Sequence, residues 1–245
     1  PAMVVTGGGR GIGAATVLAL ARAGNDVTFA YHQDATSAQR VVAQAGEAGA
    51  RCVAVQADVT VEGDVRRLFE SAAELGPIAG LVSNAGFTGH IGDLADTPVK
   101  VIRRVIDVNL TGAVLCSRRA AQLMSTKRGG EGGAIVHVSS AAATLGSAHE
   151  YVHYAAAKAG IEALTVGLAK ELAGEGVRVN AVAPGIVDTE IHARAGRPDR
   201  ARTAAGRIPL GRAAQPDEIT PAVLWLLSSA AGYTTGAIIR VAGGL

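Results

Sequence analysis

The segment YAAAK places a tyrosine and a lysine four residues apart, at Tyr154 and Lys158. The Ala-rich sequence around them is typical of a helix, where residues four apart lie one above the other on the same face. A tyrosine hydroxyl exchanges protons poorly near neutral pH because its ordinary pKa is about 10, but a neighbouring ammonium group lowers that pKa. The spacing predicts that Tyr154 is a general acid/base tuned by Lys158. A packed tyrosine beside a solvated lysine is the structural alternative.

A hydroxyl donor precedes this pair in the sequence. Ser140 follows the apolar run AIVHV, and a serine at the end of a strand can hydrogen-bond a substrate oxygen and stabilise charge on it. Ser139 is the alternative donor, and helix capping is the structural explanation for Ser140. Three further side chains lie near Tyr154, either bordering a substrate pocket or, for the histidines, offering another base: Tyr151, His149 and His153.

The stretch TGGGRGIG, residues 6–13, follows the first apolar run of the chain. Its glycines allow a sharp turn and a close approach of the backbone to a ligand. Because the turn leads from a strand into a helix, its amides and the positive end of the helix suit a pyrophosphate, although an ordinary loop has the same composition. The residues expected to bind a dinucleotide here are Gly7, Gly9, Arg10, Gly11, Ile12 and Gly13.

The residue at the end of the second predicted strand helps to distinguish a site for NAD from a site for NADP. Sites for NAD usually place an acidic residue there to bind the ribose 2′-hydroxyl, and this chain has Tyr31. Arg10 and His32 are positioned to meet a 2′-phosphate, so we expect NADP(H) rather than NAD(H). Asp34 argues the other way, because a small shift of the loop would bring its carboxylate to the ribose.

Asp58 and Val59 end the third predicted strand. A carboxylate and a backbone amide at this place can hold an adenine ring. Asp58 is equally suited to cap the helix that follows, and the two roles are compatible.

The order of elements along the chain is that of a parallel sheet covered by helices. The predicted strands are Met3–Thr6, Val27–Tyr31, Arg51–Gln56, Gly80–Ser83, Ala134–Ser139, Val177–Val182 and Ile238–Val241. The predicted helices are Ile12–Ala23, Ser37–Ala48, Val61–Leu75, Pro98–Leu123, Tyr154–Ala173 and Pro216–Leu227. Without a linker or repeat between them, these elements predict one α/β domain over residues 1–245, a Rossmann-type doubly wound, seven-stranded parallel sheet with helices on both faces.

Composition narrows the classes of function. The 245 residues are 49% hydrophobic and 18% charged, enough to bury a large core. No apolar run is long enough to span a bilayer and no secretion signal is evident, so we expect a cytoplasmic protein. The net charge of +2 and scarce aromatic residues disfavour nucleic acid as a partner. Cys52 and Cys116 lack metal-site spacing and are expected to be reduced, with no metal bound.

Five motifs in this order resemble those of the short-chain dehydrogenase/reductase family. They are TGGGRGIG, NAG at 84–86, VNLTG at 108–112, YAAAK at 154–158 and PGIVDT at 184–189. The resemblance covers the whole chain and is nearest to 3-oxoacyl-carrier-protein reductases and glucose 1-dehydrogenase-like members. One departure is the spacing of Ser140 and Tyr154, which is one residue longer than usual in the family.

The resemblance implies roles for individual residues. Tyr154 would be the general acid/base, Lys158 would lower its pKa and hold the nicotinamide ribose, and Ser140 would position the substrate. Asn109 would hold a water through its backbone carbonyl and extend a proton relay from Lys158. The resemblance also implies a homotetramer. Further cofactor contacts would come from Asn84, Ala85, Gly86, Pro184, Gly185, Val187 and Thr189.

The resulting expectation is an enzyme that transfers a hydride between a nicotinamide cofactor and a carbonyl or secondary alcohol, most simply an NADPH-dependent ketone or 3-oxoacyl reductase. A sugar or polyol dehydrogenase and a non-catalytic NADP-binding regulator are the alternatives. The loop from Asp188 to Gly211 is expected to select the substrate. Its arginines suit an anion, a solvated face or a subunit contact: Arg194, Arg197, Arg200, Arg202 and Arg207. Lys127 and Arg128 could dock an acidic carrier protein or lie in an exposed loop.

Overall fold

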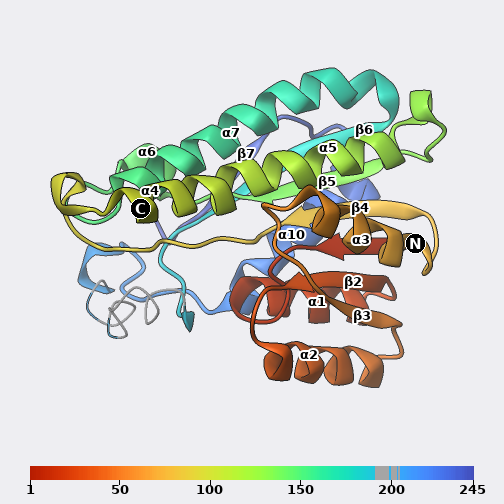
Figure 1. The fold of residues 1–245 in the computed structure, drawn as a ribbon, viewed down its shortest axis with the longest axis horizontal. Coiled ribbons are helices and arrows are strands. Elements are labelled where there is room, and N and C mark those ends of the chain that lie inside the picture. Colours follow the sequence, from red (N-terminus) through yellow and green to blue (C-terminus); the bar gives the residue numbers. More distant parts are fainter. Residues whose placement is uncertain (191–198, 200–202, 204) are drawn as a thin grey trace.

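The structure is a computed structural model that describes residues 1–190, 199, 203 and 205–245. Its centre is a sheet of 7 parallel strands in the order β3-β2-β1-β4-β5-β6-β7 (Figure 1). The strands are β1 Ala2–Val5, β2 Asp26–Tyr31, β3 Cys52–Gln56, β4 Ile78–Ser83, β5 Gly133–Val138, β6 Val177–Pro184 and β7 Ile238–Val241. This confirms the predicted doubly wound fold.

Helices cover both faces of the sheet, and each face has its own apolar core. On one face, α3, α5 and α7 pack a core that includes Phe69 and Met124. On the other face, α1, α2 and α10 pack a core that includes Phe29 and Leu226. The helices are α1 Gly11–Arg22, α2 Ala35–Glu47, α3 Glu62–Ala73, α4 Val99–Ile106, α5 Gly112–Met124, α6 Ala142–Leu145, α7 Val152–Leu172 and α10 Thr220–Leu227.

The strand order reverses between β1 and β4, which are neighbours in the sheet but far apart in the chain. Strands 1, 2 and 3 extend to one side of this point and strands 4 to 7 to the other. In open parallel sheets, ligands bind beyond the carboxyl ends of the strands at such a reversal. The glycine stretch that follows β1 lies there.

Two predicted helices are wrong in detail. The single helix expected over Pro98–Leu123 is α4 and α5 joined by a π-helical stretch, Asp107–Thr111. Periodicity does not reveal one wider turn inside an otherwise continuous helix. The helix expected over Pro216–Leu227 begins with a 3-10 turn, Pro216–Glu218, and only then becomes α10. A short helix, α6, was not predicted.

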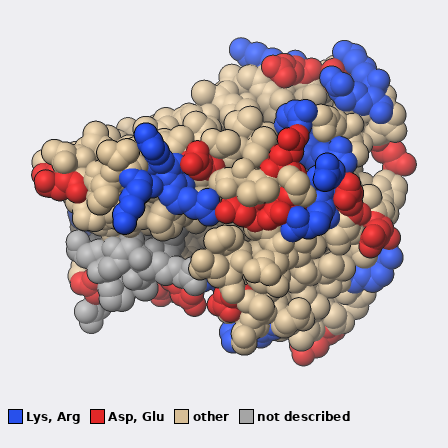
Figure 2. All heavy atoms as spheres, viewed as in Figure 1, with Lys and Arg blue, Asp and Glu red and all other residues tan. Residues whose placement is uncertain are grey.

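The surface over α4 and α5 carries mixed charge. Lys and Arg side chains gather there in separate groups with Asp and Glu side chains between them (Figure 2). In the part of the chain that the structure describes, no helix is both long and apolar enough to cross a membrane. Cys52 and Cys116 are free thiols, and burial raises the pKa of Cys116 to about 12.

Candidate active site

The turn between β1 and α1 brings backbone close to backbone. Gly7 and Gly11 have φ values of +66° and +53°, a conformation that favours glycine. Gly13 is a packing residue, because a Cβ there would lie 2.1 Å from the carbonyl oxygen of Gly7. These glycines let the first turn of α1 lie against the turn that precedes it.

The start of α1 is open to a ligand. Arg10 occupies the N-cap position, and its side chain makes no capping hydrogen bond. The amides of a first helical turn have no partner within the helix, so they and the helix dipole favour an anion. Within the part of the chain that the structure describes, Arg10 Nη1 is buried without a hydrogen-bond partner, and it lies 3.6 Å from the Glu190 carboxylate.

Asn84 ties the end of β4 to the glycine turn. Its side-chain amide donates to the carbonyl oxygens of Thr6 and Gly7 at 3.0 and 3.2 Å. The buried Thr6 hydroxyl accepts from the backbone amides of Asn84 and Ala85, both at 2.9 Å. These contacts fix the glycine turn at the point where the strand order reverses.

A cavity of about 450 Å³ opens along these carboxyl ends. All the residues predicted to bind the cofactor or act in catalysis line it, except Gly13 and Asn109, which lie behind its wall. The lining residues include Gly7, Gly9, Arg10, Gly11, Ile12, Tyr31, His32, Asp58, Val59, Asn84, Ala85, Gly86, Ser140, Tyr154, Lys158, Pro184, Gly185, Val187 and Thr189.

Tyr154 and Lys158 lie on the face of α7 that borders the cavity, and both are buried. Lys158 Nζ lies 5.6 Å from the centroid of the Tyr154 ring and donates to the carbonyl oxygen of Val138 at 2.7 Å. Burial raises the pKa of Tyr154 above its ordinary value, and the neighbouring Tyr151 adds to this effect. Burial also lowers the pKa of Lys158 to about 8. The predicted lowering of the Tyr154 pKa is therefore not seen, because burial raises it.

The two serines after β5 have different surroundings. Ser139 is buried, and its hydroxyl contacts the Lys158 carbonyl oxygen at 3.3 Å and the Glu162 carboxylate at 3.0 Å. The Ser140 side chain hydrogen-bonds Tyr154, which opposes part of the rise in the Tyr154 pKa. The Ser140 oxygen also accepts from the amide of Ala142 at 3.1 Å. Of the two hydroxyls, it is that of Ser140 that lies beside the phenol.

Asn109 lies in the π-helical stretch behind the cavity. Its side-chain amide donates to the carbonyl oxygens of Phe87 and Val105 at 2.7 and 2.8 Å, and its Oδ1 accepts from the amide of Phe87. A Cβ at Gly86 would lie 3.1 Å from Asn109 Oδ1 and 3.7 Å from Lys158 Nζ. A side chain at position 86 would therefore crowd both Asn109 and Lys158.

The opposite end of the cavity holds the residues predicted to discriminate between cofactors. Tyr31, His32 and Asp34 all line it. The Asp34 carboxylate caps α2 by accepting from the amide and the hydroxyl of Ser37 at 2.9 and 2.8 Å. These hydrogen bonds from Ser37, with a contribution from Arg10, lower the pKa of Asp34.

The histidines near Tyr154 are engaged elsewhere. His149 Nδ1 lies 2.8 Å from the Asp93 carboxylate at the exposed surface. His153 is buried, and its Nε2 faces the carbonyl oxygen of Thr88 at 3.3 Å. Neither histidine lines the cavity, whereas Tyr151 does, with its ring edge-on to Tyr154 at 5.3 Å between centroids.

The cations singled out in the sequence have separate placements. Arg194, Arg197, Arg200 and Arg202 lie outside the described residues. Arg207 pairs with the Glu150 carboxylate at 3.2 Å. Lys127 and Arg128 follow α5 and precede β5, so they lie near the amino end of this strand, whereas the cavity opens at the carboxyl ends. A carrier protein bound at those two residues would not face the cavity.

Sequence reasoning missed several lining residues: Phe87, Thr88, Arg104, Val108 and Ile186. A signal existed for one pair, because Arg104 and Val108 are four residues apart on a helix and share a face. Thr6 was also missed as an anchor, although it directly precedes the glycines.

These observations fit a nicotinamide dinucleotide. The glycine turn, the open start of α1 and the buried Arg10 nitrogen suit its phosphates, and the far end of the cavity has the polar groups that suit adenosine. Tyr154, Ser140 and Lys158 lie together at the remaining end.

The comparisons with known proteins point the same way. The sequence model of a family described as "Enoyl-(Acyl carrier protein) reductase" matches residues 7–245. The chain is 44% identical to the uncharacterized oxidoreductase YgfF of Escherichia coli (strain K12), covering 98% of each chain. It is 43% identical to the cis-4-hydroxycyclohexanecarboxylate dehydrogenase of Sinomonas cyclohexanicum, over 98% of this chain and 94% of that protein. It is 38% identical to a 3-oxoacyl-[acyl-carrier-protein] reductase of Synechocystis sp. (strain ATCC 27184 / PCC 6803 / Kazusa), over 99% and 95%.

Solved structures agree with the fold. A short-chain type dehydrogenase/reductase from Mycobacterium marinum superposes with a TM-score of 0.92 at 33% identity, covering 99% of this chain and 94% of that one. A short-chain dehydrogenase from Burkholderia cenocepacia J2315 in complex with NADP superposes with a TM-score of 0.90 at 33% identity, covering 99% and 96%. The chain therefore belongs to the short-chain dehydrogenase/reductase family, whose members are oxidoreductases that use nicotinamide cofactors.

Proposed function

We propose that the protein is an NADP(H)-dependent reductase that converts a ketone to a secondary alcohol. The observation that carries the proposal is the placement of Tyr154, Ser140 and Lys158 in one cavity with the glycine turn. Tyr154 gives a proton to the substrate carbonyl oxygen, and Ser140 donates a hydrogen bond to the same oxygen. The cofactor, when bound, supplies the hydride.

The protonation state of Tyr154 supports reduction as the direction. Burial raises the pKa of the phenol, so it carries its proton at neutral pH. A protonated phenol is the form required to donate to a carbonyl oxygen. Lys158 holds the ribose next to the nicotinamide, and the backbone carbonyl of Asn109 extends the path by which Tyr154 regains a proton.

The surroundings of the second strand support a preference for NADP(H). Arg10 and His32 line the end of the cavity where a 2′-phosphate would lie. Asp34, the residue that would bind an unmodified ribose, is occupied as the cap of α2. Arg10 Nη1 lies near the Glu190 carboxylate but finds no hydrogen-bond partner among the described residues, and the Asp34 carboxylate is held by Ser37. Together these two features favour the phosphorylated cofactor.

The wall beside Tyr154 supports a substrate whose reacting carbonyl is flanked by apolar groups. Phe87, Tyr151 and Ile186 line this part of the cavity and present aromatic or aliphatic surface. We therefore propose a small ketone or a 3-oxoacyl group. A relative named for a hydroxycyclohexanecarboxylate and another named for a 3-oxoacyl thioester are consistent with this class.

The experiment is a panel of cyclic ketones, 3-oxoacyl thioesters and sugars. The ketones and thioesters are tested with NADPH and NADH by the loss of absorbance of the reduced cofactor. The sugars are tested in the oxidative direction with NADP. Turnover of a ketone or a 3-oxoacyl compound with NADPH supports the proposal. Binding of NADPH without turnover of any compound would point to a regulator, and turnover of sugars alone would point to a sugar dehydrogenase.

We also propose that the protein is a homotetramer. Apolar side chains remain exposed on the long helices, among them Val99 at 62%, Val114 at 40% and Val166 at 36%. A second copy would cover them. Light scattering after gel filtration tests this, and a monomeric mass would contradict it.

A further inference from the structure

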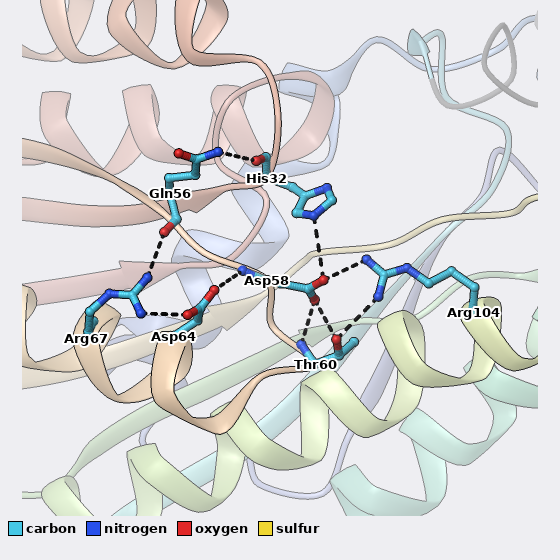
Figure 3. Close-up of polar contacts among 7 residues, drawn as sticks. All are labelled: His32, Gln56, Asp58, Thr60, Asp64, Arg67 and Arg104. Atoms are coloured by element: carbon cyan, nitrogen blue, oxygen red, sulfur yellow. Dashed lines mark hydrogen bonds and ion pairs between the residues drawn. The ribbon is translucent and has the colours of Figure 1, made fainter.

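The Asp58 carboxylate joins three segments at the adenosine end of the cavity (Figure 3). Its Oδ1 accepts from the amide and the hydroxyl of Thr60 at 2.9 and 2.7 Å. Its Oδ2 accepts from Arg104 Nη2 at 2.9 Å and lies 3.6 Å from His32 Nε2. Figure 3 shows the Arg104 side chain reaching from its helix across to the loop that follows β3.

Arg104 makes two contacts with this loop. Besides the Asp58 oxygen, its guanidinium donates from Nη1 to the Thr60 hydroxyl at 3.3 Å. A planar guanidinium that contacts two acceptors fixes their relative orientation, which a lysine ammonium does less well. Although burial opposes it, the hydrogen bonds from Thr60 and Arg104 lower the pKa of Asp58 to about 2, so the carboxylate is ionised at neutral pH.

Several other contacts of the loop come from the neighbouring β3 and α3. The Asp58 amide donates to Asp64 Oδ2 at 2.9 Å. Asp64 pairs with Arg67 at 2.6 Å, and Arg67 also contacts the carbonyl oxygen of Gln56. Arg104 differs from these residues because it comes from α4, a helix separate from β3 and α3.

A second contact from the same helical run holds the loop. A Cβ at Gly112, at the start of α5, would lie 2.6 Å from Val59 Cγ2, so this helix packs directly on the residue after Asp58. In an unbroken α-helix, residues 104 and 112 would point ~80° apart, because each residue turns the chain by about 100°. The π-helical stretch Asp107–Thr111 holds about one more residue in its turn. It thereby brings Arg104 and Gly112 to nearly the same face.

We propose that Arg104 is a positioning residue for the adenine of the cofactor. It holds the Asp58 carboxylate so that the remaining acceptor position on Oδ2, on the side of His32, faces the cavity. A carboxylate has about four acceptor positions, and Thr60 and Arg104 occupy three of them. The fourth accepts from the exocyclic amino group of adenine. This inference rests on the proposed function, because it requires an adenine dinucleotide in the cavity.

The test compares the two halves of the cofactor. Binding of 5′-AMP, nicotinamide mononucleotide, NADPH and NADH is measured by calorimetry for the wild type, Arg104→Gln, Arg104→Lys and Arg103→Gln. Arg103 is the matched control, since it is the neighbouring arginine of α4 and is exposed. We expect Arg104→Gln to weaken 5′-AMP, NADPH and NADH by about the same factor, about tenfold, and to leave nicotinamide mononucleotide unchanged. Arg104→Lys should recover part of the loss, and Arg103→Gln should bind as the wild type does.

Unchanged binding of 5′-AMP by Arg104→Gln would overturn the inference, as would an equal loss for both halves, which would indicate general loosening of the site. If Arg104→Gln does not fold, Arg104→Lys carries the same comparison, and equal binding of 5′-AMP by Arg104→Lys and the wild type would overturn it. A wild type that binds neither NADPH nor NADH would overturn the proposed function itself. The two failures are therefore distinguishable.

Discussion

Lys158 stands beside Tyr154 on α7, yet its ammonium donates to the carbonyl oxygen of Val138 rather than to the phenol. Burial lowers the pKa of Lys158 to about 8, and burial raises the pKa of Tyr154. The lysine is therefore the first of the two groups to lose its proton as the pH rises.

The loss of the Lys158 proton before that of Tyr154 predicts how kcat/KM depends on pH in the alkaline range. Because kcat/KM reports groups of the free enzyme, we expect kcat/KM for reduction to fall as the pH rises through about 8, where the Lys158 ammonium is lost. A guanidinium in its place would stay charged, so the variant Lys158→Arg should be slower but should lack this limb. A limb near pH 8 that persists in Lys158→Arg would assign it to another group.

The fold was predictable because its signals are local and repeated. Strands such as β1 and β5 are almost wholly buried and read as continuous apolar runs, which is typical of a parallel sheet covered on both faces. The glycine turn and the Tyr154–Lys158 spacing are also local. Both lie at the carboxyl ends of the strands, where the cavity opens, and both can be recognised in the sequence without long-range contacts.

What could not be predicted depends on contacts between distant segments. The sequence does not show that Arg104 contacts Asp58, because the two residues are 46 positions apart. The chain has several arginines, and nothing in the sequence indicates which of them pairs with Asp58. It does not show how deeply Tyr154 is buried, and burial reverses the expected direction of its pKa shift. The π-helical turn at Asn109 likewise arises from packing.

Substitutions of the two serines should have different effects, one on catalysis and the other on stability. Ser140→Ala should lower kcat by about 100-fold, because it removes a donor to the substrate oxygen. Ser139→Ala should keep most of the activity and lower the free energy of unfolding by about 1 kcal/mol, since it removes the buried contact with Glu162. Steady-state kinetics and urea unfolding of both variants check this. If Ser139→Ala lost activity as severely as Ser140→Ala, the assignment of roles would be wrong.

Arg10 should decide between the two cofactors. We expect the wild type to bind NADPH tens of times more tightly than NADH, a difference of about 2 kcal/mol, and Arg10→Ala to remove most of it. Quenching or enhancement of cofactor fluorescence measures both affinities. The matched control is Arg22→Ala, in the last turn of α1 and away from the cavity. Equal binding of NADH and NADPH by the wild type would contradict the preference.

His137 makes stability depend on pH. The ring is buried between the hydroxyls of Ser117 and Thr165, both at 2.8 Å. Thr165 donates to the carbonyl oxygen of Ile161, so it accepts from His137 Nδ1, and Nε2 accepts from Ser117. The neutral ring is therefore the form that fits.

Burial, with a contribution from Lys158, lowers the pKa of His137 from 6.5 to about 4. Between these values the unfolded chain binds the proton and the folded one does not, so stability is complete above pH 6.5 and falls as the pH drops toward 4. We expect the free energy of unfolding of the wild type to fall by about 1.4 kcal/mol more per pH unit than that of His137→Gln. Urea unfolding between about pH 6.5 and 4.5 measures both slopes, and parallel slopes would contradict the neutral ring.

The most direct test of the account is the effect of Tyr154→Phe on NADPH binding and on turnover of the best ketone in the panel. The change removes the proton donor and keeps the ring. We expect kcat to fall by about 10²- to 10⁴-fold while the Kd for NADPH changes by less than about threefold. A variant that turns over ketone at the wild-type rate would contradict the role of Tyr154 as the proton donor.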